Sequence, residues 1–300
     1  MKPEWLTIKL CSTEKYGDVK NTINSLGIYT VCVEAKCPNI TDCWSSGTAT
    51  FMVLGDLCTR GCRFCSVSKM AKGVTVDNAE PDKLALAISK WGLEYVVITS
   101  VCRDDLEDQG SGHFARCIEE IKRTNPNVVI EVLIPDFKGD IECLKRIVDA
   151  KPDVLGHNIE TVERLTSSVR DRRANYRQSL NVLKDAKKLN PNVYTKSAMM
   201  LGIGENDDEV LQVMRDLRAN GVDFLALGQY LRPSKFQLEV SEYIRPEKFE
   251  QFKQKALEMG FLYVAAGPFV RSSYKAGEYF IKSVIKHKNG LNSSIEVPRI

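Results

Sequence analysis

The sequence predicts an α/β fold, a partial (β/α)6 TIM-like barrel, from three observations. Short runs rich in β-branched residues alternate with longer segments of helical periodicity, as in repeated βα units around a parallel sheet. Six such runs occur, which is fewer than the eight strands of a closed barrel. The segments between them carry helix start and stop signals. A partial barrel is therefore favoured over a doubly wound sheet.

The six strands are predicted where the apolar runs begin. They are TFMVLG from Thr50, YVVITS from Tyr95, NVVIEVLI from Asn127, DVLGHNIE from Asp153, VYTKSAMML from Val193 and DFLALGQYL from Asp223.

The helices between the strands have recognisable ends. Pro81 lies in the first turn of a helix that closes at Gly92, and Asn206 caps a helix that closes at Gly221. A later helix is predicted over 246–259.

We expect three regions along the chain. An extension over 1–49 is too short for a core of its own, the barrel occupies 50–231, and a second extension over 232–300 holds the apolar run FLYVAAGPFV and a lysine-containing tail.

Composition excludes several classes of protein. With 42 basic and 39 acidic residues the net charge is +3, too mild for a nucleic-acid-binding face. No apolar stretch is long enough to cross a membrane, and residues 1–5 do not resemble a signal or transit peptide. We therefore expect a cytosolic protein without a nucleic-acid or membrane partner.

Six of the ten cysteines lie between positions 32 and 65, which favours metal binding over disulfides in a reducing compartment. The other four are interpreted as buried apolar residues: Cys11, Cys102, Cys117 and Cys143.

Cys58, Cys62 and Cys65 form C-x3-C-x2-C directly after the first predicted strand. Three thiolates at one point suit a [4Fe-4S] cluster with one iron left without a protein ligand. Structural zinc is the rival, but it prefers four ligands, and no fourth lies nearby. This motif, in a loop after the first strand of a βα series, resembles the radical S-adenosylmethionine superfamily, in which that open iron binds S-adenosylmethionine.

Cys32, Cys37 and Cys43 form a second triplet, C-x4-C-x5-C, before the first strand. These thiols could hold a second cluster with a distant fourth ligand, hold zinc, or simply pack. The pattern by itself does not decide.

A narrower resemblance covers residues 1 to about 280. The segments CVEAKCPNITDCW, FMVLGDLCTRGCRFC, ITSVCRDDLEDQGSGHF, HNIETVERL, KSAMMLGIGE, LGQYLRPS and GPFVRSSYKAGE are similar to the lipoyl synthase family. The resemblance implies that Cys32, Cys37, Cys43 and Ser272 hold an auxiliary [4Fe-4S] cluster. It also implies insertion of two sulfur atoms, at C6 and C8, into a protein-bound octanoyl-lysine, with sulfur taken from that cluster.

The same resemblance implies a set of partners. The substrate is an octanoylated carrier, such as the glycine cleavage H protein or the lipoyl domain of a 2-oxoacid dehydrogenase E2. A ferredoxin or flavodoxin would donate electrons, and an iron-sulfur carrier would repair the cluster. The alternatives are another sulfur-inserting radical enzyme, a two-cluster electron-transfer protein and a zinc-stabilised binding module. The tail lysines Lys275, Lys282, Lys286 and Lys288, beside Glu278, could steer an acidic carrier or form a solvated surface.

Polar residues at predicted strand ends are expected to face a bound cofactor. Asn158 and Glu160 are the foremost candidates to bind S-adenosylmethionine, because residues two apart on a strand share a face. His157 then points to the other face. The remaining candidates are Ser100, Arg103, Asp104, Asp105, Lys196 and Ser197.

Overall fold

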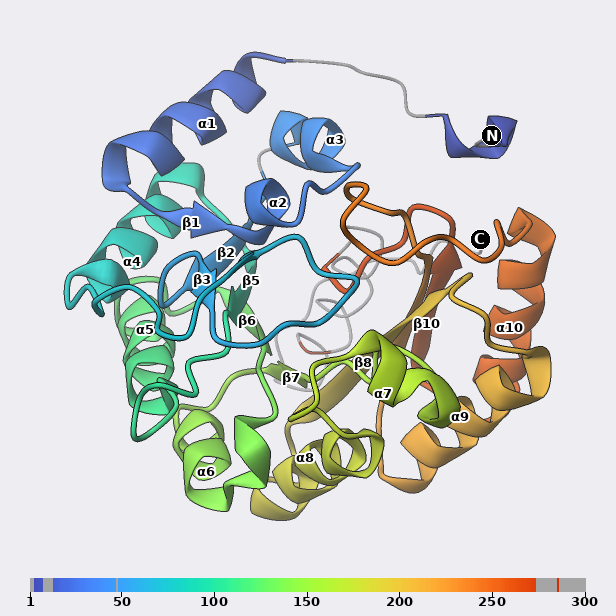
Figure 1. Cartoon of the computed structure of the whole chain (residues 1–300). Coiled ribbons are helices and arrows are strands. Elements are labelled where there is room, and N and C mark those ends of the chain that lie inside the picture. The colour runs from blue at the N-terminus through green and yellow to red at the C-terminus, as the bar shows by residue number, and fades with distance from the viewer. Residues whose placement is uncertain (1–2, 8–12, 47, 274–284, 286–300) are drawn as a thin grey trace.

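An eight-stranded sheet forms the centre of the computed structural model, which describes residues 3–7, 13–46, 48–273 and 285 (Figure 1). Its strand order is β1-β2-β5-β6-β7-β8-β9-β10, and every neighbouring pair except β1 and β2 is parallel. The strands are β1 Tyr29–Thr30, β2 Thr50–Val53, β5 Tyr95–Ser100, β6 Val129–Leu133, β7 Val154–Gly156, β8 Tyr194–Leu201, β9 Phe224–Gln229 and β10 Tyr263–Gly267. A separate pair joins β3 Leu57–Cys58 to β4 Ser68–Lys69.

Helices form a ring around the sheet (Figure 1). The α-helices are α1 Glu14–Leu26, α2 Val31–Glu34, α3 Ile40–Ser45, α4 Glu80–Trp91, α5 Ser111–Thr124, α6 Ile141–Asp149, α7 Thr166–Val169, α8 Tyr176–Leu189, α9 Asp207–Ala219 and α10 Pro246–Glu258. Short 3-10 turns lie at Glu4–Leu6, Phe137–Gly139 and Glu163–Leu165.

The predicted helix signals act as expected. Helix α4 has proline in its first turn and ends at Gly92, whose φ of 60° is the left-handed conformation that glycine favours. Helix α9 begins with a capping box, in which the Asn206 side chain and the Glu209 side chain each bind the other residue's backbone N–H.

All six predicted strands are present, and the α/β partial barrel is confirmed. The prediction of six units was incomplete, because the sheet gains a parallel strand, β10, within the apolar run FLYVAAGPFV. This strand pairs along the free edge of β9. Its Ala-Ala-Gly sequence has weak strand propensity, so pairing with β9 rather than local preference determines it.

The inside of the barrel is filled at one end and lined by small residues at the other. Toward the amino ends of the strands, large side chains pack with Ile285: Tyr95, Val97, Val129, Val154 and Phe224. Toward the carboxyl ends, Ala198, Ala226 and Ala265 leave room for Val270 from the following loop. The open end of the barrel is therefore the end where the strands stop, as expected for this architecture.

A buried charged group lies among the large side chains. The Lys196 Nζ is 2.7 and 2.9 Å from the two carboxylate oxygens of Glu131, and the Tyr95 hydroxyl also bonds this carboxylate. Both charged side chains are nearly inaccessible. Lys196 was expected near a cofactor at a strand end, but it serves this internal pair instead.

Replacing Lys196 by Met should strongly destabilise the cofactor-free protein. The change leaves the Glu131 carboxylate buried without a cation, which typically costs about 3–5 kcal/mol of unfolding free energy. Urea unfolding followed by circular dichroism measures the loss. Lys188→Met is the control, because Lys188 pairs with Asp185 in solvent and should lose little. Equal losses in the two variants would contradict a structural role for the buried pair.

Candidate iron-sulfur and cofactor site

The loop after β2 brings three cysteine thiols together at the carboxyl end of the sheet. Each sulfur accepts a backbone N–H: Cys58 from Arg60 (3.4 Å), Cys62 from Asp171 (3.3 Å) and Cys65 from Val67. Burial, together with the negative charge of the thiolates at Cys62 and Cys58, raises the pKa of Cys65 to about 12. Burial also raises the pKa of Cys62. Thiols that repel each other's ionisation in this way suit a shared cation.

Cys102 is a fourth thiol at this place, although it was interpreted as an ordinary packing residue. Its thiol hydrogen-bonds Cys58, which lowers the pKa of Cys58 to about 6 and raises that of Cys102. A signal was present in the sequence, because Cys102 lies two residues after the end of the second predicted strand. In a parallel barrel that position faces the loop after the first strand.

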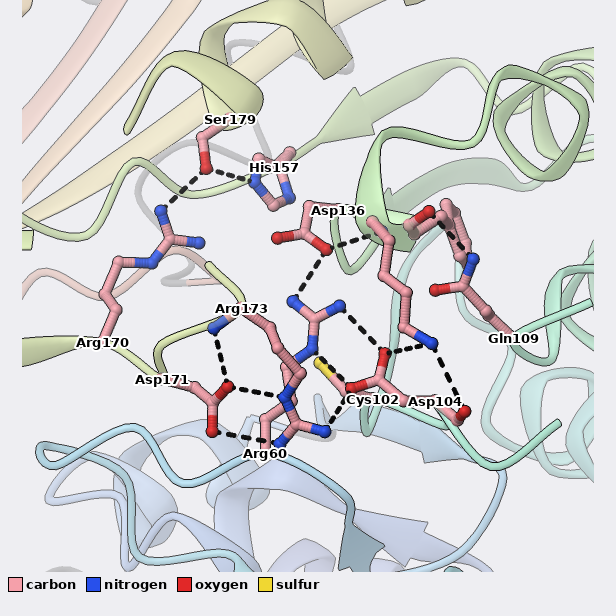
Figure 2. A network of polar contacts seen from close by, with 12 residues as sticks. Arg60, Cys102, Asp104, Gln109, Asp136, His157, Arg170, Asp171, Arg173 and Ser179 are labelled. Atoms are coloured by element: carbon pink, nitrogen blue, oxygen red, sulfur yellow. Dashed lines mark hydrogen bonds and ion pairs between the residues drawn. The ribbon is translucent and has the colours of Figure 1, made fainter. Parts of the chain in front are cut away.

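The segment after β5 holds the cysteine loop (Figure 2). The Cys102 carbonyl accepts hydrogen bonds from the Thr59 N–H (3.0 Å) and hydroxyl (2.9 Å). Arg60 donates two hydrogen bonds to Asp104, at 2.9 and 3.0 Å, and its Nη1 lies 2.7 Å from Asp136. Arg103, Asp104 and Asp105 were expected to face a cofactor, but they bind this loop and each other.

The segment after α7 holds the loop from the opposite side (Figure 2). The Asp171 carboxylate accepts the Gly61 N–H at 2.7 Å, and Arg173 donates to the Thr59 carbonyl at 2.6 Å. Arg173 also pairs with Asp104 at 3.0 Å, so both segments share one network.

Asn158 and Glu160 lie beside the thiols, as their position after β7 predicts. The Asn158 amide donates to Glu160 at 3.2 Å, and the Glu160 carboxylate is close enough to raise the pKa of both Cys62 and Cys65. Burial raises the pKa of Glu160, and Arg170 opposes that shift. Ser197, another candidate, donates to the His157 carbonyl and accepts the Ile159 N–H.

Arg170 was not singled out from the sequence. Its Nη1 donates to the Ser179 hydroxyl at 2.7 Å, and Ser179 lies 2.9 Å from the Nε2 of His157 (Figure 2). The His157 Nδ1 faces the Ile134 carbonyl at 2.9 Å and therefore carries a proton. Burial lowers the pKa of His157 to about 4, so the ring is neutral at neutral pH and its Nε2 accepts the Ser179 hydroxyl. The buried Nε of Arg170 has no hydrogen-bond partner in the described part of the chain.

The second triplet lies at α2 and α3, with the loop after β10 against it. Burial raises the pKa of Cys32 and Cys37, and the charge of Cys37 raises that of Cys32 further. The Asn39 amide donates to the Phe269 carbonyl at 2.7 Å. The positive charge of Arg271 opposes the effect of burial and lowers the pKa of Cys37.

The loop after β10 reaches the triplet because Gly228 leaves it room. A Cβ at Gly228 would lie 2.1 Å from the Val270 carbonyl oxygen. Ser272, half-buried, follows Arg271 in this turn. Tyr274 of the RSSY motif, Lys275, Glu278, Lys282, Lys286 and Lys288 lie outside the described residues.

The donors fit iron-sulfur clusters and a polar cofactor. Two groups of three thiols supply soft ligands for iron. Beside the Cys58 group, three buried polar atoms have no partner within the described ranges: Ser100 Oγ, Asp136 Oδ2 and Arg170 Nε. Buried polar atoms without partners are unusual, and a bound polar ligand would satisfy them.

Comparison with known proteins defines the class. Residues 52–217 match the Radical SAM superfamily. Among solved structures, the FeFe-hydrogenase maturase HydG from Carboxydothermus hydrogenoformans aligns with a TM-score of 0.56 at 15% identity, over 79% of this chain and 65% of that one. Methylornithine synthase (PylB) aligns with a TM-score of 0.50 at 13% identity, over 86% of this chain and 82% of that one. The chain therefore has the radical S-adenosylmethionine fold.

Sequence relatives narrow the class. Mitochondrial lipoyl synthase of Aedes aegypti is 53% identical over 95% of this chain and 74% of its own length, and that of Drosophila melanogaster is 51% identical over 99% and 80%. Apicoplast lipoyl synthase of Plasmodium yoelii yoelii is 52% identical over 98% of this chain, which spans 59% of that relative. The chain belongs to the lipoyl synthase family, whose members use S-adenosylmethionine and two [4Fe-4S] clusters.

The expected cytosolic location is wrong. These relatives are named mitochondrial or apicoplast proteins, which points to an organelle. Import signals are short segments separate from the folded domain, so the composition of that domain does not indicate the compartment in which the protein works. None of the helices in the described ranges is long and apolar enough to span a membrane.

The neutral buried His157 should make the cofactor-free protein less stable as the pH falls. Burial lowers its pKa to about 4, whereas the unfolded chain binds this proton near pH 6.5. Between these values the unfolded state holds more protons, so stability is complete above pH 6.5 and decreases toward pH 4, by about 3 kcal/mol in total.

Urea unfolding of wild type and His157→Gln across this range measures the effect. The glutamine does not titrate, so the stability of wild type relative to the variant should fall as the pH is lowered. A difference between the two proteins that stays constant from pH 8 to pH 4 would contradict the shifted histidine.

Proposed function

We propose that this chain inserts two sulfur atoms, at C6 and C8, into an octanoyl group carried on a lysine of a lipoyl-domain protein, which yields a lipoyl group. The observation that carries the proposal is the meeting of residues 269–271 with the Cys37–Asn39 turn. This contact supports the proposal that Ser272, the first serine of the RSSY motif, belongs to the second cysteine triplet. A protein that only transferred electrons would need no such contact between its two ends.

In this proposal Cys58, Cys62 and Cys65 hold the cluster that binds S-adenosylmethionine. When bound, the pair supplies a one-electron cleavage that generates a 5′-deoxyadenosyl radical, which is able to remove hydrogen from an unactivated carbon. The protein positions and shields these groups. The backbone N–H groups on the three sulfurs, from Arg60, Asp171 and Val67, stabilise the thiolates for metal binding.

Asn158, Glu160 and Arg170 are proposed to hold S-adenosylmethionine. Glu160 offers a carboxylate to hydroxyl or ammonium groups, and Asn158 orients it. Arg170 offers its unpaired Nε to a carboxylate, while Ser179 and His157 hold the guanidinium in place. The amino acid and ribose portions of the cofactor need this mixture of donors and acceptors.

Cys32, Cys37, Cys43 and Ser272 are proposed to hold the auxiliary cluster, the source of sulfur. A serine oxygen is a harder and weaker ligand for iron than a thiolate, so this bond is the one most easily given up. The flanking regions 1–49 and 232–300 then carry the auxiliary ligands, and 50–231 carries the radical chemistry. The two flanking regions also contribute the edge strands of the sheet, β1 from 1–49 and β10 from 232–300.

The substrate is a protein, since lipoyl synthases act on lipoyl-domain proteins. We propose the octanoylated glycine cleavage H protein or an E2 lipoyl domain. A ferredoxin or flavodoxin would supply electrons, and an iron-sulfur carrier would restore the auxiliary cluster after each product.

Mass spectrometry of an octanoyl-lysyl peptide tests the function directly. The reconstituted protein is incubated anaerobically with S-adenosylmethionine and dithionite, and we expect sulfur insertion together with release of 5′-deoxyadenosine. Cys62→Ala should abolish both products. Ser272→Ala should retain deoxyadenosine and lose most of the sulfur insertion.

Each contradicting outcome identifies which part of the proposed function is wrong. Deoxyadenosine without sulfur insertion in the wild type would overturn the substrate or the auxiliary cluster and favour a different sulfur-inserting radical enzyme. Neither product from a protein loaded with both clusters would favour electron transfer. A colourless, zinc-loaded protein would exclude all of the radical chemistry.

Arg170→Gln should weaken the binding of S-adenosylmethionine. Loss of one hydrogen bond to a charged group costs about 1.5–3 kcal/mol, or about 10- to 150-fold in Kd. Equilibrium dialysis of reconstituted protein measures this loss. Arg177→Gln is the matched control, because Arg177 is exposed and pairs with Glu163 away from the thiols. Unchanged affinity in Arg170→Gln would exclude Arg170 from the cofactor site.

A further inference from the structure

The cysteine loop over 55–73 begins at a residue with an unfavourable backbone conformation. Leu54, at the end of β2, has a φ of 69°, in the left-handed region that branched side chains rarely adopt. Its N–H donates to the Glu80 carboxylate at 3.0 Å, and its carbonyl accepts from Arg103 Nη1 at 3.3 Å. Both polar groups of this residue are therefore held by buried charged side chains.

The same loop ends against the partner of that arginine. The Gly73 N–H donates to Asp105 Oδ2 at 3.2 Å, and Arg103 donates through Nε and Nη2 to both Asp105 oxygens, at 2.9 and 3.0 Å. Gly73 lies flat against the guanidinium, since a Cβ there would come within 2.3 Å of Arg103 Nε. A single ion pair thus binds Leu54, directly before the loop, and Gly73, the last residue of the loop.

This pair is buried and fully used. The Arg103 and Asp105 side chains are 2% and 8% exposed. Burying two charges is favourable only with good geometry and further hydrogen bonds, which the bidentate contact, Leu54 and Gly73 supply. None of these contacts includes a cysteine sulfur, so the pair acts on the thiols only through the backbone of the loop.

We propose that Arg103 and Asp105 form a clasp that sets the ends of the cysteine loop and so preorganises the three thiols before any metal binds. This inference rests on the proposed role of Cys58, Cys62 and Cys65 as cluster ligands. A free loop would sample many thiol arrangements, and closing it at both ends removes most of them. Arg103 and Asp105 are therefore positioning residues.

Limited trypsin digestion of the metal-free protein tests the clasp without any activity. Lys69 and Lys72 are exposed sites on the loop, next to the Gly73 end. Asp105→Asn should increase the cleavage rate at these two sites by about 10- to 100-fold, because loss of a charged hydrogen bond favours local opening by that factor. Cleavage at Lys188, on the distant helix α8, should stay at the wild-type rate.

The control is Asp77→Asn, the same change a few residues beyond the loop. Asp77 pairs with Lys83 in solvent and should leave cleavage at every site unchanged. Asp105→Glu should restore part of the protection. In reconstituted Asp105→Asn protein, a chelator should remove iron from the cluster at Cys58, Cys62 and Cys65 at least tenfold faster, while the auxiliary cluster resists as in wild type.

A second variant covers the case in which Asp105→Asn does not fold. Gly73→Ala keeps every charge but places a methyl group against Arg103, and it should loosen the loop in the same selective way. Wild-type cleavage at Lys69 and Lys72 in folded variants would overturn the clasp. An equal rise in cleavage at Lys188 would also overturn the clasp, because it would mean that the ion pair stabilises the whole protein and not the loop in particular. A wild-type protein without lipoyl product but with the selective effect would overturn the proposed function alone.

Discussion

The ion pairs of Arg60 with Asp104 and Asp136 are the interaction on which the rest of the site depends. Arg60 lies between two cysteines of its loop, and its side chain is only 4% exposed. At that burial a guanidinium is tolerated only because two carboxylates and a fixed bidentate geometry compensate for lost hydration. The carboxylates come from the ends of β5 and β6, so the pairs fasten the cysteine loop to the rigid sheet. Arg173 and Asp171 add the same connection from the segment after α7.

The two ends of the barrel have different roles, one in stability and the other in the proposed chemistry. Large side chains and the Lys196–Glu131 pair fill the end where the strands begin, which gives a rigid base. At the other end small residues line the wall, and loops from both flanking regions enter. Gly228 is an example of a small residue that makes room for a loop. Because it has no side chain, the Val270 carbonyl can lie against it, and the segment that leads to Ser272 follows.

The barrel fold is shared more widely than the sequence of this family. Solved radical S-adenosylmethionine proteins share the barrel at 13–15% identity, so many sequences satisfy the packing of strands against helices. Two features of the resemblance to lipoyl synthase, the triplet of Cys32, Cys37 and Cys43 and the RSSY motif, lie outside the repeated βα units. The loop that precedes the RSSY motif contacts the turn between Cys37 and Cys43, because the Asn39 amide donates a hydrogen bond to the Phe269 carbonyl.

The sequence by itself determined the six βα units, the helix caps and the grouping of thiols, because periodicity, capping and loop spacing act over a few residues. It also singled out Asn158 and Glu160, although these residues follow β7 instead of lying on it, and its motifs identified the family. Only the tertiary structure decided that Arg103 and Asp105 bind a loop rather than a cofactor, that Cys102 joins the thiols, that Arg170 has an unpaired donor and that β10 extends the sheet. Each depends on partners distant in the chain, as in the contact of Asn39 with Phe269. Such contacts follow from how whole elements pack, which no local pattern specifies.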